Sequence, residues 1–212
     1  MKECRFNEDY YERGIEKGIS GYENYRWLPD LTLNMCKSIV TELDIKKTET
    51  ILDFGCAKGF VVQALRELGF DSYGCDISKY AVESSHEEVK SFLTLQKNLE
   101  QPLGNNAFYD WIFSKDVLEH IPYDSLGTII ASFKKHTDSI FIVVPLGDGK
   151  NYIVPEYEND ITHIIREDKG WWFQKFIDAG FKNLKASYTF QNVKENWWSK
   201  YPRGNLFIYT ER

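Results

Sequence analysis

The chain has 212 residues, of which 42% are hydrophobic and 27% are charged, and its formal net charge is −6 at pH 7. This length and composition predict one globular domain with a buried core and exclude a disordered chain. Lysine and arginine are scattered rather than clustered. The sequence therefore predicts no nucleic-acid partner, because binding to phosphates needs concentrated positive charge.

The longest apolar run, residues 139–146, is too short to cross a bilayer, and the charged N-terminus does not resemble a secretory signal. We therefore expect a cytoplasmic protein with no membrane partner. The cysteines show neither CxxC pairs nor a metal-ligand spacing, which indicates reduced thiols. The cysteines are Cys4, Cys36, Cys56 and Cys75.

Strand and helix patterns alternate along the chain after an irregular N-terminal arm, residues 1–30. Helices are expected over residues 31–45, 59–70, 78–90, 125–137 and 168–180. Strands are expected over residues 48–55, 71–77, 92–96, 109–116, 139–146, 182–190 and 205–211. This alternation predicts an α/β fold with a doubly wound, mostly parallel, seven-stranded sheet (Rossmann-like) in a single domain, residues 31–212. No helical pattern separates the last two strands, so we expect an antiparallel C-terminal hairpin.

A turn of small residues follows the first strand, in the sequence ILDFGCAKGF at residues 51–60. Glycine permits unusual backbone torsions and a close approach of a ligand to the backbone. In a doubly wound sheet, ligands bind beyond the carboxyl ends of the strands, where the strand order reverses. The turn containing Gly55, Ala57 and Gly59 is therefore the first candidate binding site.

Two carboxylates indicate the kind of ligand. Asp76 ends the second strand, where an acidic side chain can accept the hydroxyl hydrogens of a ribose. Asp53 lies just before the turn, where a carboxylate would repel a pyrophosphate but attract a cationic amino group. The glycine spacing also differs from the dinucleotide pattern G-x-G-x-x-G. S-adenosylmethionine fits these features, since it carries an ammonium, a sulfonium and a ribose but no phosphate. Structural alternatives for both aspartates are roles as capping residues.

Four segments, taken in order, resemble the class I S-adenosylmethionine-dependent methyltransferases. LDFGCAKG (52–59) is similar to the first motif of this family, and YGCDIS (73–78) is similar to the second. FSKDVLEHIP (113–122) resembles the segment after the fourth strand, and residues 162–181 resemble the stretch through the late helix. The resemblance covers residues 31–212 and implies a methyltransferase.

The resemblance also implies which residues contact the donor, S-adenosyl-L-methionine. The methionine part would lie against Asp53, Gly55, Cys56, Ala57 and Gly59. Asp76 and Ile77 would contact the ribose and adenine. Asn98 would lie near the adenine amino group, at a position where the family often has an acid. Ser114 and Lys115 would border the donor at the end of the fourth strand.

The aromatic N-terminal arm is expected to fold over the donor as a lid. Tyr22, Tyr25 and Trp27 would cover it, and Arg26 would pair with the donor's carboxylate or with an anionic substrate. The alternative for these aromatic residues is simple packing on a small core.

A hydroxyl acceptor needs a base, for which His163 is the first candidate and His120 the weaker one. The alternatives are a loop histidine at 163 and a structural histidine at 120. Asp116 and Glu119 could in principle hold a cation, but their spacing is not diagnostic, and we expect no metal.

The acceptor is expected to be a small molecule, since the chain lacks a basic patch and an added recognition domain. The family's short, aromatic-armed members suggest a sugar or nucleotide sugar, with O-methylation favoured and a role in polysaccharide biosynthesis, by analogy alone. A non-catalytic S-adenosylmethionine-binding protein is one alternative. A nicotinamide-dependent oxidoreductase is another, which the glycine spacing and Asp53 disfavour. The sequence does not predict the oligomeric state.

Overall fold

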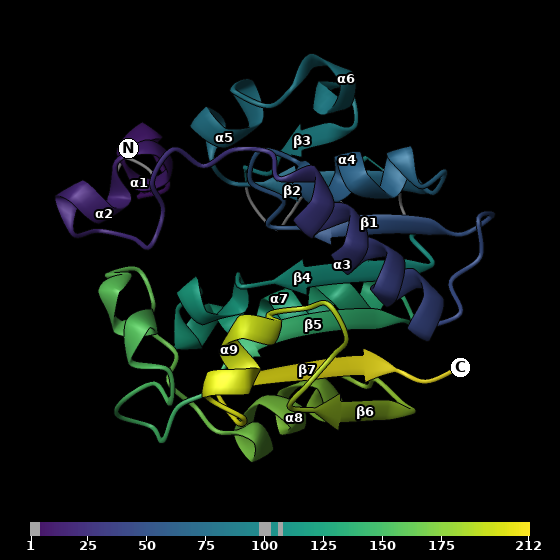
Figure 1. The fold of residues 1–212 in the computed structure, drawn as a ribbon. Coiled ribbons are helices and arrows are strands. Elements are labelled where there is room, and N and C mark those ends of the chain that lie inside the picture. Colours follow the sequence, from purple (N-terminus) through teal and green to yellow (C-terminus); the bar gives the residue numbers. More distant parts are fainter. Residues whose placement is uncertain (1–4, 98–102, 106–107) are drawn as a thin grey trace.

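The computed structural model describes residues 5–97, 103–105 and 108–212 and contains one mixed sheet with the strand order β3-β2-β1-β4-β5-β7-β6 (Figure 1). The neighbouring strands from β3 to β5 are parallel, and β7 runs antiparallel to both β5 and β6. The expected doubly wound fold is therefore confirmed. The strands are β1 (Thr50–Phe54), β2 (Asp71–Asp76), β3 (Leu93–Leu95), β4 (Trp111–Lys115), β5 (Ile140–Pro145), β6 (Leu184–Ser187) and β7 (Asn205–Thr210).

Helices follow the expected order, with three differences. The expected helix over 78–90 is two short helices, because the chain becomes extended at His86. The N-terminal arm contains two short helices, and a further helix lies between β6 and β7. The helices are α1 (Glu8–Glu12), α2 (Gly14–Lys17), α3 (Pro29–Glu42), α4 (Phe60–Glu67), α5 (Lys79–Glu83), α6 (Glu87–Lys90), α7 (Tyr123–His136), α8 (Lys169–Asp178) and α9 (Glu195–Lys200).

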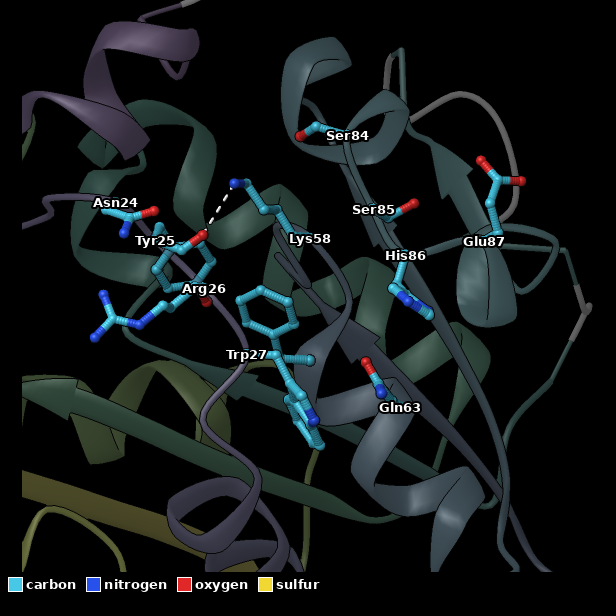
Figure 2. A pocket seen from close by; sticks show the side chains of 11 residues that line it. Asn24, Tyr25, Arg26, Trp27, Lys58, Gln63, Ser84, Ser85, His86 and Glu87 are labelled. Carbon is cyan, nitrogen blue, oxygen red and sulfur yellow. Dashed lines mark hydrogen bonds between the residues drawn. The ribbon is translucent and has the colours of Figure 1, made fainter.

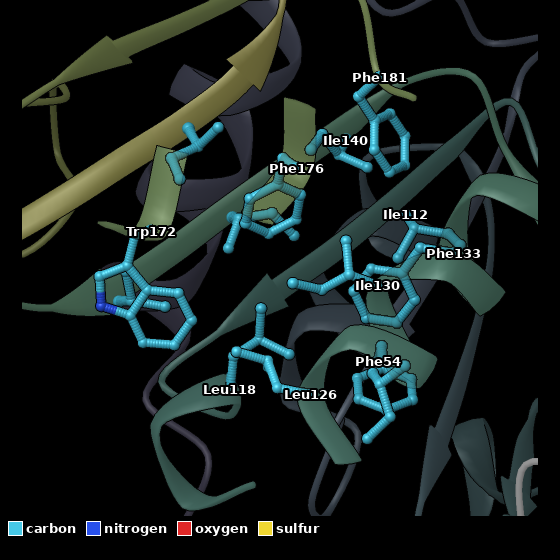
Figure 3. Close-up of a cluster of buried hydrophobic side chains, with 14 of the residues drawn as sticks. Phe54, Ile112, Leu118, Leu126, Ile130, Phe133, Ile140, Trp172, Phe176 and Phe181 are labelled. Carbon is cyan, nitrogen blue, oxygen red and sulfur yellow. The ribbon is translucent and has the colours of Figure 1, made fainter. Parts of the chain in front are cut away.

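The sheet separates two apolar cores because successive side chains of a strand point to opposite faces. On β4, Trp111 and Phe113 pack with α3 and α4, whereas Ile112 packs with α7 and α8. The second of these cores includes the buried rings of Phe133 and Phe176 (Figure 3). Both faces of the central strands are thus covered by helices, and the carboxyl ends of these strands are left for ligands. Among the described residues, no helix is long and apolar enough to cross a membrane.

The strand order reverses between β1 and β4, which is where a doubly wound sheet forms a crevice. Two segments distant in sequence meet near this end of the sheet, namely the N-terminal arm and the connection from β5 to α8 (Figure 1). The Tyr10 hydroxyl of the arm donates a hydrogen bond of 2.7 Å to Asp160 in that connection. The fold therefore places a cover over the carboxyl ends of the strands.

The turn from β1 to α4 needs its small residues. Gly55, Ala57 and Gly59 have φ angles of +80°, +48° and +79°, in the left-handed region that disfavours side chains. A Cβ atom built on Gly55 would lie 2.4 Å from Cγ2 of Val117. The backbone amides of Gly55 and Cys56 both donate to the Cys75 carbonyl, at 2.8 and 3.2 Å, and so bind the turn to β2.

We predict that Gly55→Ala lowers the free energy of unfolding by about 1–3 kcal/mol, because the new methyl group meets Val117 at an unfavourable φ. Urea unfolding followed by circular dichroism measures this change. Gly127→Ala is the matched control, since nothing lies within 4 Å of a Cβ built on that α7 residue. Equal urea midpoints for the two variants would contradict the assignment of strain to Gly55.

Candidate active site

Asp76 at the end of β2 connects the glycine turn to α5. Its Oδ2 accepts a hydrogen bond of 2.8 Å from the Ala57 amide, and its Oδ1 accepts one of 2.7 Å from the Ser78 amide. The sequence predicted a ligand-binding role for Asp76, with capping as the structural alternative. The bond to Ser78, the N-cap residue of α5, agrees with a structural role, and the bond to Ala57 is a contact that the spacing did not reveal. The backbone amide of Ile77 also donates to this carboxylate. A carboxylate offers about four acceptor positions, so these amides leave room for a further donor.

Asp53 is buried beside Asp76, with 5% of its surface exposed. Burial, reinforced by the charge of Asp76, raises the pKa of Asp53 to about 7, and Lys115 opposes this change. Burial raises the pKa of Asp76 as well, although backbone hydrogen bonds partly offset the effect. Two neighbouring carboxylates in one buried site disfavour ionisation of both, and a cationic group placed between them would relieve that cost.

The end of β4 carries ionic contacts that the sequence pattern did not reveal. Lys115 forms an ion pair of 2.6 Å with Asp116, which also pairs with Lys194. Burial alone would raise the pKa of Asp116, but the two lysines hold it well below its usual range. Lys194 further contacts the Tyr157 hydroxyl at 2.8 Å.

Two other predicted donor contacts on these strand ends differ in exposure. Ser114 is buried, and its Oγ has no hydrogen-bond partner among the described residues. Ile77 is 54% exposed. Asn98 lies outside the described residues.

Polar contacts hold the N-terminal arm against the glycine turn. Lys58 donates to Glu12 at 2.5 Å and to the Tyr25 carbonyl at 2.9 Å. Tyr80 also donates to Glu12, at 3.0 Å. Burial, followed by the negative charge of Asp53, raises the pKa of the Tyr25 hydroxyl. The lid role of Tyr25 stays a prediction.

Arg26 and Trp27 line a pocket of about 490 Å³ between the arm, α4 and the connection from α5 to α6. Figure 2 shows the Arg26 guanidinium on the side of this pocket away from His86 and Glu87. Tyr25 and Lys58 lie between these two sides. Arg26 is exposed, in contrast to the buried carboxylates.

The two candidate bases lie side by side, although 43 positions separate them in the sequence (163 − 120). The ring centroids of His120 and His163 are 4.6 Å apart. Burial, and then the neighbouring His163, lowers the pKa of His120 to about 4, and burial lowers the pKa of His163 as well. Both imidazoles are therefore neutral near pH 7, as a base must be before it accepts a proton.

Acidic groups surround these histidines. Nε2 of His163 is 3.9 Å from Glu119 Oε1 and 3.9 Å from Asp160 Oδ2. Asp160 lies three positions before His163 in the chain, whereas the contact with Glu119 could not be read from the sequence. In the arm, burial and then the charges of Tyr25, Asp116, Asp160 and Glu119 raise the pKa of Tyr22.

The described cysteines are free and buried, namely Cys36, Cys56 and Cys75. Burial raises the pKa of each thiol. The expected reduced thiols are therefore consistent with the structure at these three positions, while Cys4 lies outside the described residues.

Solved structures with the same fold are methyltransferases. An S-adenosylmethionine-dependent methyltransferase from Archaeoglobus fulgidus has a TM-score of 0.64 and 16% identity, covering 87% of this chain and 95% of the other. One from Clostridium acetobutylicum has a TM-score of 0.61 and 12% identity, covering 87% and 92%. Magnesium protoporphyrin IX methyltransferase from Synechocystis, solved with bound S-adenosylmethionine, has a TM-score of 0.55 and 16% identity, covering 86% and 81%. No curated protein matches the sequence.

The family model described as a methyltransferase domain matches residues 28–202. This match spans the glycine turn, both carboxylates and the histidine cluster. The enzyme class expected from the motifs is therefore confirmed, and the chain belongs to the methyltransferase-domain family.

Proposed function

We propose that this enzyme transfers the methyl group of S-adenosyl-L-methionine to a hydroxyl group of a small molecule, with a sugar or nucleotide sugar as the favoured class. The observation that carries the donor assignment is the pair of buried carboxylates at the ends of adjacent strands. Asp53 pairs in register with Gly74 of β2, two residues before Asp76. The ammonium of the donor would lie against Asp53, and its ribose hydroxyls would donate to Asp76.

Methyl transfer from a sulfonium is an in-line displacement, in which the acceptor oxygen bonds to the methyl carbon as the carbon–sulfur bond breaks. The enzyme contributes mainly by positioning the reactants and excluding water, which together supply up to about 7–11 kcal/mol. The acceptor would enter beyond β4 and β5, where Lys194, Tyr157 and the histidine cluster provide polar side chains. His163 remains the candidate base, and its Nδ1 is occupied by the Tyr157 carbonyl at 2.8 Å.

Removal of the ribose-binding carboxylate tests the donor assignment. We expect calorimetry to detect S-adenosylhomocysteine binding by the native chain and a loss of about 100-fold or more in Asp76→Ala, since two hydrogen bonds to a charged group disappear. Asp71→Ala, at the start of the same strand, is the control. Binding of NAD with no response to S-adenosylhomocysteine would contradict the proposal.

Turnover and the acceptor class need a separate measurement. Incubation with methyl-labelled donor and a panel of free and nucleotide-linked sugars should transfer label to a hydroxyl of one of them. Label on a nitrogen or carbon, or on another class of metabolite, would contradict the acceptor assignment while leaving the donor assignment intact.

Donor affinity should depend on pH through Asp53. Its pKa of about 7 means that the carboxyl is mostly protonated at pH 6 and mostly ionised at pH 8. Only the ionised form pairs with the donor's ammonium, so the Kd for S-adenosylhomocysteine should fall by about tenfold from pH 6 to pH 8. Asp53→Asn should bind weakly and with no such slope. A slope of equal size in Asp53→Asn would assign the titration to another group.

Residues 1–30 are proposed as a lid, held shut by Glu12 through Lys58 and Tyr80. Glu12→Ala should raise the dissociation rate of S-adenosylhomocysteine by about fivefold, the equivalent of about 1 kcal/mol. Stopped-flow measurements give this rate. Glu16→Ala is the control, because Glu16 is exposed on the neighbouring α2. An unchanged rate in Glu12→Ala would separate the arm from donor retention.

A further inference from the structure

Three potential metal ligands converge beneath the N-terminal arm. Glu119, His120 and His163 each place one ligand atom so that these atoms lie within 4.8 Å of one another. Glu119 and His120 belong to the 3-10 turn Leu118–His120 after β4, whereas His163 follows the turn Pro155–Asn159 after β5. Two separate connections are thus needed to build the cluster, and both lie at the end of the sheet that carries the donor site.

Hydrogen bonds fix the orientation of the His120 ring. The Thr162 hydroxyl donates to Asp160 Oδ1 at 2.5 Å, because a carboxylate beside it can only accept. The same hydroxyl oxygen lies 2.7 Å from Nδ1 of His120, so it accepts from Nδ1–H. This tautomer leaves the lone pair on Nε2, the nitrogen available to a metal.

His163 is oriented in the same way. Its Nδ1 lies 2.8 Å from the Tyr157 carbonyl, which can only accept, so Nδ1 carries the hydrogen. Nε2 therefore holds a lone pair and is directed toward Glu119. A metal-binding histidine commonly donates its other ring N–H to a carbonyl or to a carboxylate-linked group, as both histidines do here.

Glu119 provides the third group and lacks a partner for one of its oxygens. Its side chain is 1% exposed, and Oε2 has no hydrogen bond within the described residues. Its Oε1 is 3.9 Å from Nε2 of His163, beyond hydrogen-bond reach. Two ligands bound to one ion at about 2.1 Å each are separated by about 3–4 Å, so an ion between these atoms would account for the spacing.

No cationic side chain neutralises this carboxylate in the described cluster. Lys194 and Lys115 act on it electrostatically, but both are already paired with Asp116. Phe6 and Tyr10 of the arm pack against the His120 ring, with centroids at 5.4 and 6.5 Å, and limit access of water. A buried carboxylate with one unpartnered oxygen among the described residues, close to two imidazole rings, is an arrangement that a divalent cation would stabilise.

We propose that Glu119, His120 and His163 bind a divalent transition-metal ion, for which Zn²⁺ is the test ion. Two imidazoles and one carboxylate suit such ions and leave coordination positions open. This site was not expected from the sequence, because His163 comes close to Glu119 and His120 only when the chain is folded. Its role rests on the proposed function: the ion, in place of a free His163, would lower the pKa of the acceptor hydroxyl.

Calorimetry of the chelator-treated full chain with Zn²⁺ tests the site, and visible absorption after addition of Co²⁺ reports the ligand geometry. Binding should be at least about 100-fold weaker in Glu119→Gln and in His163→Ala. It should be about 10–100-fold weaker in Thr162→Val, which keeps all three ligands but removes the hydrogen bonds of this hydroxyl to His120 and Asp160. His86→Ala is the matched control, because the His86 side chain is 61% exposed. It should bind Zn²⁺ as the native chain does.

Binding of S-adenosylhomocysteine by each variant shows that it is folded and keeps this test separate from the donor assignment. If His163→Ala binds neither Zn²⁺ nor S-adenosylhomocysteine, the more conservative His163→Gln replaces it. Equal Zn²⁺ affinity in the native chain, Glu119→Gln and His163→Ala would overturn the metal site, as would a native chain with no detectable affinity. Neither result would affect the proposed donor.

Discussion

The site depends on two buried carboxyl groups, those of Asp53 and Asp76, at the carboxyl ends of neighbouring strands. Asp53 is the penultimate residue of β1 and pairs in register with Gly74, two residues before Asp76 at the end of β2. The parallel pairing of β1 and β2 therefore brings the two carboxylates near each other. Asp76 is partly compensated by the amides of Ala57 and Ser78. Asp53 receives only the longer-range effect of Lys115, and its pKa consequently moves to about 7. Because the Asp53 carboxylate is buried and poorly solvated, pairing with a cationic ligand would stabilise it.

Two parts of the surrounding structure, the glycine turn and the N-terminal arm, lie against the carboxyl ends of these strands. Left-handed residues in the glycine turn bring the backbone, rather than side chains, to the ends of β1 and β2. The N-terminal arm then closes over these strand ends, through Glu12 on the donor side and Tyr10 on the histidine side. In our proposal, one short segment would therefore cover both the donor site and the acceptor side.

The sequence was sufficient for the features that depend on local patterns. Continuous apolar strands alternating with amphipathic helices predicted the doubly wound sheet, and the small residues after Asp53 predicted the turn. The sequence was insufficient for features that depend on contacts between segments distant along the chain. The helix expected over 78–90 breaks where His86 is extended, and α9 forms between two strands that were expected to be a simple hairpin.

Side-chain partners were the least predictable part of the site. The pairing of Asp116 with Lys194 joins the end of β4 to the residue preceding α9. Glu119 and His163 likewise meet only after β5 and the following connection have folded. Periodicity reports which face a residue occupies but carries no information on contacts between distant loops. The polar groups expected for catalysis were therefore identifiable singly, whereas their arrangement was not.

A crystal structure with S-adenosylhomocysteine bound tests the central claim most directly. The account predicts electron density for the amino group beside Asp53 and for the ribose hydroxyls beside Asp76, with the arm closed over both. Density for the ligand in the pocket lined by Arg26 and Trp27, or anywhere else away from the two carboxylates, would contradict it.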